Sequence, residues 1–360
     1  MELTRYLDAF TERDWQAADD SAGPVRFAMV GLGWWVREWA IPAVADSDFC
    51  ETTVLVSRDE AAAASLAGEV DTVESAVSTE QFREGAAGDD YDAVYVCTPN
   101  ATHLPYVEAA ADAGKAVLCE KPMEATVERA ERMVAAAREG GVTLMVAYRM
   151  HTEPAVRRVR EMLGDGLLGQ PVQVHGRMSQ PLLDMIEDPN QWRLDPKMAG
   201  RGATVTDIGL YPLNTARFLL DSDPVAVEAT MRSEDEAFDE VPDQHAAFTM
   251  EFADGTQAVC TASQQAAQSS HITVVGTEGS ASVEPAFFPD EPRQLTVSRG
   301  GTTVETTFEQ IDQMREEFDY FADCLLSERK PTGDGEHGLV DMRVMDAIYD
   351  AAEDGRRIEL

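Results

Sequence analysis

Lysine is nearly absent from this chain of 360 residues. Only Lys115, Lys121, Lys197 and Lys330 occur, and 66 acidic residues against 29 basic ones give a formal net charge of -37. A protein that binds nucleic acid through phosphate contacts needs the opposite balance, so nucleic acid is excluded as a partner. The many negative charges also repel one another. This repulsion is screened at about 1 M salt, where the Debye length falls to ~3 Å, so the composition predicts a halophilic, cytoplasmic protein of a salt-accumulating organism.

Cysteine motifs and long apolar runs are missing as well. The five cysteines include no C-x-x-C pair, so we expect reduced thiols and neither a disulfide framework nor a metal site. No apolar run is long enough to cross a bilayer, and the acidic N-terminus lacks a signal-peptide pattern, so no membrane partner is expected. An apolar content of 44% favours a folded chain over a disordered one.

The stretch VRFAMVGLGWWV at 25–36 organises the rest of the chain. An apolar run of strand length, two glycines and an amphipathic segment are typical of the start of a dinucleotide-binding βαβ unit. Gly31 is expected in the tight turn, and Gly33, without a Cβ, lets backbone N–H groups approach a pyrophosphate. Because Val36 occupies the third glycine position, an ordinary βα turn remains the alternative.

Strand and helix patterns alternate up to residue 150. Apolar strands are expected at 25–30, 52–56, 93–97, 116–119 and 143–147. Helical segments separate them, which predicts an α/β Rossmann domain with a parallel sheet over residues 25–150. Residues 1–24 precede it as an N-terminal arm. An apolar stripe in this arm predicts a helix, packed either on its own domain or on a neighbouring subunit.

The pattern changes in residues 151–360. Alternating strands separated by Asp-Gly, Glu-Gly and Gly-Gly turns predict a large, mostly antiparallel sheet. Helices expected at 206–220, 313–328 and 337–353 complete an α+β domain for substrate binding and oligomerisation, and the last helix is suited to pack back on the first domain. The open face of the sheet predicts a homo-oligomer, a dimer or a tetramer.

The end of the second strand bears on the choice of cofactor. An NAD site carries Asp or Glu there to bind the ribose 2′-hydroxyl, whereas this chain has Ser57 and Arg58. A guanidinium can pair with a 2′-phosphate, so Arg58 favours NADP over NAD. Asp59 is expected to cap the next helix, and an ordinary exposed loop arginine is the alternative for Arg58.

Further candidate residues follow the fourth and fifth strands, because ligands of such sheets bind beyond the carboxyl ends of the strands. Thr98 and Asn100 follow the fourth strand and are expected to contact the cofactor. Glu120 and Lys121 end the fifth strand, where a surface Glu–Lys pair is the alternative. A lysine at this place in a lysine-poor chain favours a functional role.

The second domain contributes Asp207 and Tyr211. They lie four residues apart on an expected helix and so share a face. A carboxylate beside a phenol can orient it or bind a substrate hydroxyl. A capped helix with an ordinary core tyrosine is the alternative.

Together, four motifs resemble the glucose–fructose oxidoreductase/inositol dehydrogenase family of NAD(P)-dependent sugar oxidoreductases. They are G-x-G at 31–33, CTPNATH at 97–103, E-K-P at 120–122 and D-x-G-x-Y at 207–211. The segments 147–154 and 192–214 are similar to the branch that contains glucose–fructose oxidoreductase and the NADP-dependent D-xylose dehydrogenases. The resemblance extends from Val25 to Leu360.

The resemblance implies NADP-dependent oxidation of an aldopyranose at C1 to the aldonolactone, with D-xylose the favoured sugar and NAD the weaker cofactor. The implied cofactor-binding residues are Gly31, Gly33, Ser57, Arg58, Thr98, Asn100, Glu120, Lys121, Trp192 and Arg193. The implied catalytic residues are Lys121, Tyr211 and Asp207, and the implied substrate contacts are Tyr148, Arg149 and His151.

Two classes of function remain open, because a fold does not fix a function. One is a dehydrogenase acting on xylose, another sugar, inositol or a dihydrodiol; the other is a non-catalytic sensor of NAD(P) or sugar. A phenol has a pKa near ~10, and a lysine within ~4–6 Å would favour the phenolate. Lys121 and Tyr211 therefore favour the enzyme, with Tyr211 as the base and Asp207 orienting the sugar.

Overall fold

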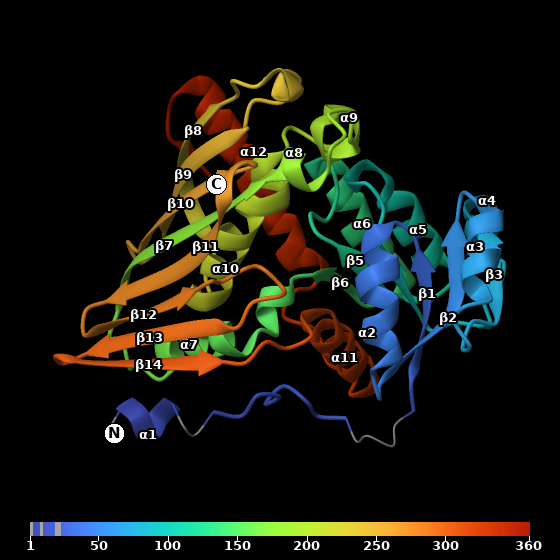
Figure 1. Cartoon of the computed structure of the whole chain (residues 1–360), viewed down its shortest axis with the longest axis horizontal. Coiled ribbons are helices and arrows are strands. Elements are labelled where there is room, and N and C mark those ends of the chain that lie inside the picture. The colour runs from blue at the N-terminus through green and yellow to red at the C-terminus, as the bar shows by residue number, and fades with distance from the viewer. Residues whose placement is uncertain (1–2, 8–9, 19–22) are drawn as a thin grey trace. The chain divides into compact units, whose positions relative to one another are not determined.

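The computed structural model describes residues 3–7, 10–18 and 23–360. The chain divides into two compact units (Figure 1). Unit 1 comprises Met1–Asp14, Met150–Ile311 and Val340–Leu360, and unit 2 comprises Trp15–Arg149 and Asp312–Leu339. In this division, unit 2 contains residues 312–339 together with Trp15–Arg149, and the domain boundary expected near residue 150 stays a prediction.

The sheet of unit 2 has six parallel strands in the order β3-β2-β1-β4-β5-β6. Its strands are β1 (Val25–Val30), β2 (Cys50–Ser57), β3 (Ser75–Ser78), β4 (Ala93–Val96), β5 (Ala116–Glu120) and β6 (Leu144–Ala147). Burial on both faces explains why β1 and β4 are nearly continuous apolar runs. The strand order reverses between β1 and β4, the place where such sheets bind ligands.

The helices of unit 2 include one that comes from far along the chain. They are α2 (Ile41–Ala45), α3 (Glu60–Ala67), α4 (Thr79–Arg83), α5 (Leu104–Asp112), α6 (Val127–Gly140) and α11 (Gln313–Leu326). In α11, the ring of Phe318 lies 5.1 Å from that of Phe27 on β1 and 4.9 Å from that of Tyr95 on β4. Helix α11 therefore completes the core of unit 2.

The sheet of unit 1 has nine strands in the order β14-β13-β12-β11-β7-β10-β9-β8-β15. They are β7 (Pro171–Pro181), β8 (Pro224–Arg232), β9 (His245–Phe252), β10 (Gln257–Ser263), β11 (Gln265–Gly276), β12 (Gly279–Glu284), β13 (Arg293–Arg299), β14 (Thr302–Phe308) and β15 (Ile358–Glu359). Strands β7 and β10 pair in parallel, and the other pairs are antiparallel. The predicted mostly antiparallel sheet is confirmed.

Helices cover one face of this sheet. The helices of unit 1 are α1 (Leu3–Leu7), α7 (Pro154–Gly164), α8 (Leu182–Met185), α9 (Pro196–Ala199), α10 (Leu210–Leu220) and the part of α12 (Gly335–Asp354) from Val340 onward. A Cβ on Gly176 of β7 would lie 2.6 Å from the Cβ of Pro212, so this glycine lets α10 pack closely on the sheet. On β10, Ala258, Cys260 and Ala262 are buried while the alternate residues are exposed. The opposite face is therefore open.

The first residues of the chain pack on unit 1. The ring of Tyr6 is buried beneath the guanidinium of Arg158, which lies 4.0 Å from its centroid. Its hydroxyl donates a hydrogen bond to Asp165, 2.8 Å away. These contacts are with residues of the same chain that were expected in the second domain, and packing of the arm on a neighbouring subunit stays a prediction. Residues 1–2, 8–9 and 19–22 of the expected arm lie outside the described residues.

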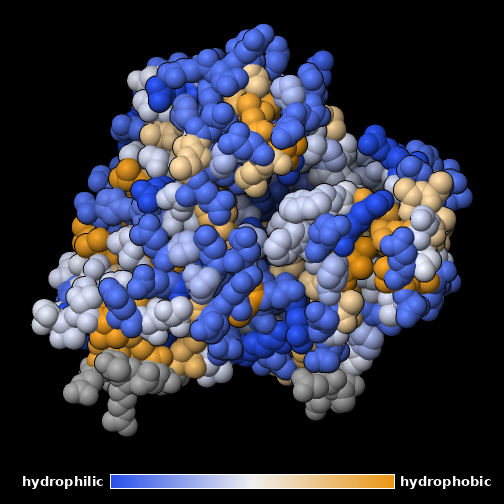
Figure 2. Space-filling model, viewed as in Figure 1, coloured by the Kyte–Doolittle hydropathy of each residue, from blue (hydrophilic) through white to orange (hydrophobic). Residues whose placement is uncertain are grey.

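The described residues contain no helix long and apolar enough to cross a membrane. In the same part of the chain, no group of three or more histidine, cysteine or carboxylate side chains is arranged to hold a metal. No disulfide bond joins the five cysteines, all of which lie within the described residues, and four of them are buried. Figure 2 shows a visible surface dominated by hydrophilic residues, in keeping with the acidic composition.

Candidate active site

The glycine turn after β1 has the expected strained conformation. Gly31 has a φ of +90°, and a Cβ there would lie 2.2 Å from the carbonyl oxygen of Cys97. Only glycine fits at this position. Gly33 differs, because a Cβ there would meet no described atom within 4 Å. No described atom would clash with a side chain at position 33. A glycine there is therefore consistent with a ligand that occupies this space.

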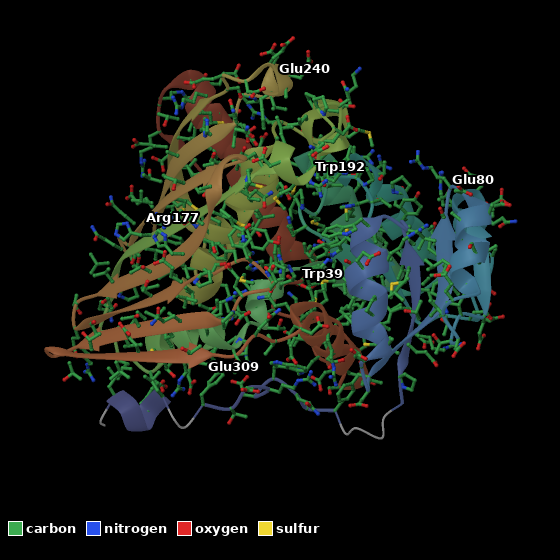
Figure 3. All side chains as sticks on the ribbon, viewed as in Figure 1. Trp39, Glu80, Arg177, Trp192, Glu240 and Glu309 are labelled. Carbon is green, nitrogen blue, oxygen red and sulfur yellow. The ribbon has the colours of Figure 1, made fainter. Side chains whose placement is uncertain are left out.

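The third position of the glycine motif is filled by the core. Val36 is fully buried at the start of a π-helical turn, Val36–Ala40. Trp35, just before this turn, stacks on Trp39 within it, and their ring centroids are 5.6 Å apart. Figure 3 labels Trp39. A valine here therefore packs the helix on the sheet and leaves the glycine turn itself intact.

The end of β2 presents an exposed arginine. Ser57 is its last residue, and Arg58 follows with its side chain exposed. The Asp59 carboxylate accepts a hydrogen bond from the N–H of Ala62 at 3.0 Å and so caps α3, as predicted. The carboxylate nearest the strand end is thus used by the helix, and Arg58 is the group available to a cofactor phosphate.

The loops after β4 and β5 are joined by a buried histidine. His103 is 0% exposed, and its Nε2 and Nδ1 lie 2.7 Å from the carbonyl oxygen of Thr98 and 3.1 Å from that of Met123. Asn100, between these contacts, is buried as well. The ring fixes the two loops relative to each other, so Thr98 is held in a defined position beyond β4.

Glu120 and Lys121 lie at the carboxyl end of β5. The hydroxyl of Tyr95 donates to one oxygen of Glu120 at 2.6 Å, and the backbone N–H of Lys121 donates to the other at 3.2 Å. Burial raises the pKa of Tyr95 well above its ordinary value, so the phenol remains a donor. The Lys121–Pro122 bond is cis. This geometry is more constrained than that of a surface Glu–Lys pair.

Unit 1 contains a second group of predicted site residues. The Nε2 of Gln264 lies 3.0 Å from Asp207, and the guanidinium of Arg193 lies 3.5 Å from the same carboxylate oxygen. Arg193 also lies 4.6 Å from the centroid of the Trp192 ring, which Figure 3 labels. Trp192, Arg193 and Asp207 are thus brought together. Tyr211, one turn further, is half-buried with its ring 5.7 Å from that of Phe287.

A buried aspartate that the sequence analysis missed positions Asp207. Asp243 accepts hydrogen bonds from the N–H groups of Ala203, Thr204 and Val205, all at 2.8 Å, and from the hydroxyl of Tyr349 at 2.7 Å. These N–H groups precede the turn that carries Asp207, so Asp243 caps it. No local signal marks Asp243, because its partners lie about 40 and 106 residues away.

Three residues implied as substrate contacts are buried. Tyr148 and Arg149, each 6% exposed, contact His337 and Trp35 at centroid distances of 5.6 and 5.5 Å. His151, also 6% exposed, stacks on Phe218 and makes a 2.9 Å hydrogen bond to Asn214. These partners give His151 a structural role within unit 1. Substrate contact by the three remains a prediction.

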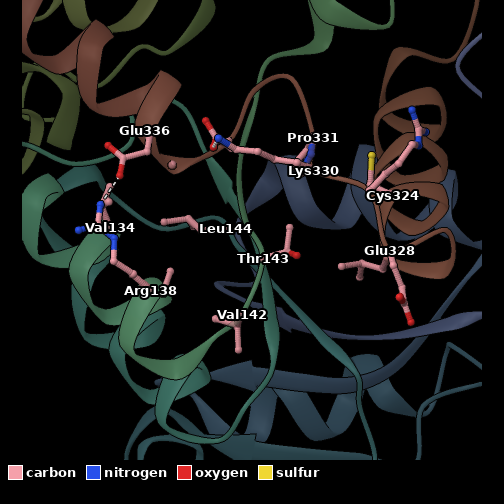
Figure 4. A pocket seen from close by; sticks show the side chains of 15 residues that line it. Val134, Arg138, Val142, Thr143, Leu144, Cys324, Glu328, Lys330, Pro331 and Glu336 are labelled. Atoms are coloured by element: carbon pink, nitrogen blue, oxygen red, sulfur yellow. Dashed lines mark hydrogen bonds and ion pairs between the residues drawn. The ribbon is translucent and has the colours of Figure 1, made fainter.

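A cavity of about 520 Å³ in unit 2 is separate from these residues (Figure 4). It is bordered by Val142 and Thr143, which precede β6 and so mark the amino ends of the parallel strands. Two ion pairs join charged side chains of its lining, Arg138 with Glu336 and Lys330 with Asp334, each at 2.5 Å. None of the predicted site residues lines it, so it is not the candidate active site.

Two family models match the chain. "Oxidoreductase family, NAD-binding Rossmann fold" covers residues 25–148, and "GFO/IDH/MocA C-terminal domain" covers residues 156–282. The chain belongs to the GFO/IDH/MocA oxidoreductase family. A D-xylose 1-dehydrogenase [NADP(+)] of Haloarcula marismortui is 56% identical over the full length of both chains. A D-xylose 1-dehydrogenase (NADP(+)) 2 of Haloferax volcanii is 34% identical over 89% of this chain and 95% of that protein.

A solved structure of the family has the same architecture. The aldose-aldose oxidoreductase from Caulobacter crescentus, complexed with glycerol, is 33% identical with a TM-score of 0.87 and covers 94% of this chain and 100% of its own. A 3-ketoreductase from Actinomadura kijaniata in complex with NADP and TDP-benzene is 26% identical with a TM-score of 0.79, over 91% of this chain and 98% of its own. The predicted fold class is confirmed.

Proposed function

We propose that this family member is an NADP-dependent sugar 1-dehydrogenase that oxidises D-xylose to D-xylonolactone. The observation that carries the proposal is the 56% identity over the full chain to a protein named D-xylose 1-dehydrogenase [NADP(+)]. The exposed Arg58 at the end of β2 and the space at Gly33 support the same cofactor. The alternative is a sensor that binds the same ligands without reaction.

The residues of this chain would act as follows. NADP, when bound, supplies the acceptor for the hydride that leaves C1 of the sugar. Tyr211 takes the proton of the C1 hydroxyl, and the positive charge of Lys121 favours the negative charge that develops on the phenol oxygen. Asp207, held by Gln264 and Arg193, accepts a hydrogen bond from a sugar hydroxyl. The lactone product can then be opened by water.

An assay of NADPH formation tests this proposal. The purified chain is incubated with NADP or NAD and a panel of D-xylose, D-glucose, L-arabinose and myo-inositol, from low to molar KCl. We expect the highest kcat/KM with NADP and D-xylose, and retention of activity in molar KCl because the acidic surface is screened there. Tight NADP binding without reduction by any sugar would favour the sensor, and inactivation by molar KCl would contradict the proposed halophilic, cytoplasmic setting.

Replacing Arg58 with alanine is expected to reduce the preference for NADP. A charge-assisted contact to a phosphate contributes roughly 1.5–3 kcal/mol, which corresponds to about 10- to 100-fold in affinity. The KM for NADP should rise by this factor while that for NAD changes little. Arg83→Ala removes the same charge elsewhere in unit 2 and is the control. An equal rise for both cofactors would show that Arg58 does not bind the 2′-phosphate.

The two glycines of the turn should respond differently to alanine. Gly31→Ala forces a side chain into a left-handed conformation and against Cys97, so it should lower the free energy of unfolding by at least about 2 kcal/mol. Gly33→Ala should leave stability within about 0.5 kcal/mol but weaken NADP binding by about tenfold, because its Cβ would enter only ligand space. Chemical denaturation and cofactor titration separate the two effects. Unchanged NADP affinity in Gly33→Ala would remove Gly33 from the cofactor site.

We also propose that two copies of the chain associate through the open face of the unit 1 sheet. The adjacent central strands β11, β7 and β10 contain no aspartate or glutamate, although the chain carries 66 of them. Val259 on β10 is 44% exposed at this face, and Figure 3 labels Arg177 on β7. A face without carboxylates lets two strongly acidic molecules approach.

A charge placed on this face should dissociate the assembly. Thr261, exposed on β10, is changed to glutamate, which would put two like charges into a symmetric interface. The mass measured by light scattering should fall to that of a monomer. Thr302→Glu on the edge strand β14 is the matched control and should leave the mass unchanged. A Thr261→Glu protein with wild-type mass would show that this face is not the interface.

A further inference from the structure

Glu317 is an unusual residue of α11. Its side chain is 0% exposed, and neither carboxyl oxygen has a hydrogen-bond partner among the described residues. Helix α11 packs on the sheet of unit 2 through the neighbouring Phe318. A carboxylate in such surroundings loses its hydration without compensation, which strongly disfavours the ionised form.

Charged groups face Glu317 from the ends of two strands. Glu120, at the end of β5, interacts with it unfavourably when both are ionised, whereas Arg149, after β6, and Lys121 favour its ionisation. Arg149 is held nearby by a hydrogen bond to Gln313, one turn earlier on α11. Burial, and then the charge of Glu120, raises the pKa of Glu317 well above its ordinary value despite the two cations. Tyr95, which donates to Glu120, is a further titratable neighbour of Glu317.

We propose that Glu317 is a positioning residue of the reaction. It is a buried, neutral carboxylic acid near Glu120, and because it is neutral the group of charges around Lys121 keeps a net positive charge. With Glu317 neutral, Glu120, Lys121 and Arg149 together carry one net positive charge. With Glu317 ionised, the group would carry none. The inference rests on the role proposed for Lys121, because that charge favours the negative charge developing on the base.

The proposal makes a direct spectroscopic prediction. In the holoenzyme at neutral pH, the infrared difference spectrum between wild type and Glu317→Gln should contain the C=O stretch of a protonated carboxylic acid. Glu316→Gln removes a carboxyl from the adjacent, half-buried position and should remove a carboxylate band instead. A carboxylate band lost in Glu317→Gln would overturn the proposal.

The pH profile of kcat tests the functional consequence. Glutamine mimics the neutral acid, so Glu317→Gln should keep kcat within about threefold of wild type at neutral pH. As the pH rises through the raised pKa of Glu317, the wild type should lose about tenfold in kcat, because one negative charge appears near Lys121. Glu317→Gln should lack this decline, while Glu316→Gln should keep it.

A failure of the role proposed for Glu317 and a failure of the function proposed for Lys121 give different results. If Glu317→Gln loses more than about tenfold at neutral pH, or shows the same alkaline profile as wild type, the role of Glu317 is overturned. If Lys121→Ala retains turnover, the proposed function of Lys121 fails irrespective of Glu317. Cofactor affinity and the free energy of unfolding, measured on each variant, show whether a loss of kcat arises from misfolding.

Discussion

Replacing Tyr211 with phenylalanine is expected to lower kcat by about 10²–10⁴-fold. The substitution keeps the ring and its packing 5.7 Å from Phe287, and removes only the oxygen that would accept the sugar proton. Binding of NADP and the free energy of unfolding should therefore change little. The measurement is single-turnover NADPH formation at saturating sugar, so that chemistry is observed and not product release.

A matched control distinguishes the loss of the catalytic base from the loss of any other tyrosine hydroxyl. Tyr91→Phe, just before β4 of unit 2, removes a phenol oxygen from a buried tyrosine at the amino end of the parallel strands and should retain wild-type turnover. If Tyr211→Phe also keeps near wild-type single-turnover rates, the base is a different residue. The positioning of Asp207 by Asp243 would then concern substrate binding alone.

Replacing Lys121 with alanine should cost at least as much as the loss of the phenol, about 10²–10⁴-fold or more in kcat. The change removes the charge that favours ionisation of the base and also a substrate contact. The backbone N–H of Lys121 that donates to Glu120 is retained, so the end of β5 should keep its conformation. The pH at which kcat reaches half its maximum should rise, because the phenolate loses its favourable neighbour.

Another lysine of the chain offers the control. Lys197 is exposed near the start of α9, and Lys197→Ala removes the same side chain and charge. It should retain wild-type kcat and KM. Equal, modest losses in both variants would indicate a general effect of net charge, and would contradict a specific role for Lys121.

Much of the fold could be predicted from sequence patterns. The apolar runs of β1, β2, β4, β5 and β6 were recognisable because buried parallel strands are almost wholly apolar. Strand β3, Ser75–Ser78, was missed, since a short polar strand at the edge of a sheet carries no such signal. The parallel pairing of β7 with β10 was equally invisible, because alternation shows which face is buried and not which strand lies alongside.

The candidate site residues were recognised from two local signals, the ends of strands and the four-residue spacing of Asp207 and Tyr211 on a helix. Gly31, Arg58 and Lys121 stand at strand ends, where local sequence indicates position. Buried residues that hold the site were not found, because Asp243 and Glu317 lie in segments with no motif. The stacking of the His151 ring on Phe218 was not indicated by any local pattern either, and its implied contact with substrate stays a prediction.

The sequence by itself determined the local chemistry of this protein. A left-handed turn requires glycine at position 31, an arginine replaces the acidic residue after β2, and a net charge of -37 opposes the binding of polyanions. Only the tertiary structure decided that α11 belongs to unit 2 and brings Glu317 close enough to Glu120 and Lys121 for their charges to act on it. The reason is physical: local patterns fix backbone conformation, whereas contacts between residues about 200 positions apart depend on how whole faces pack.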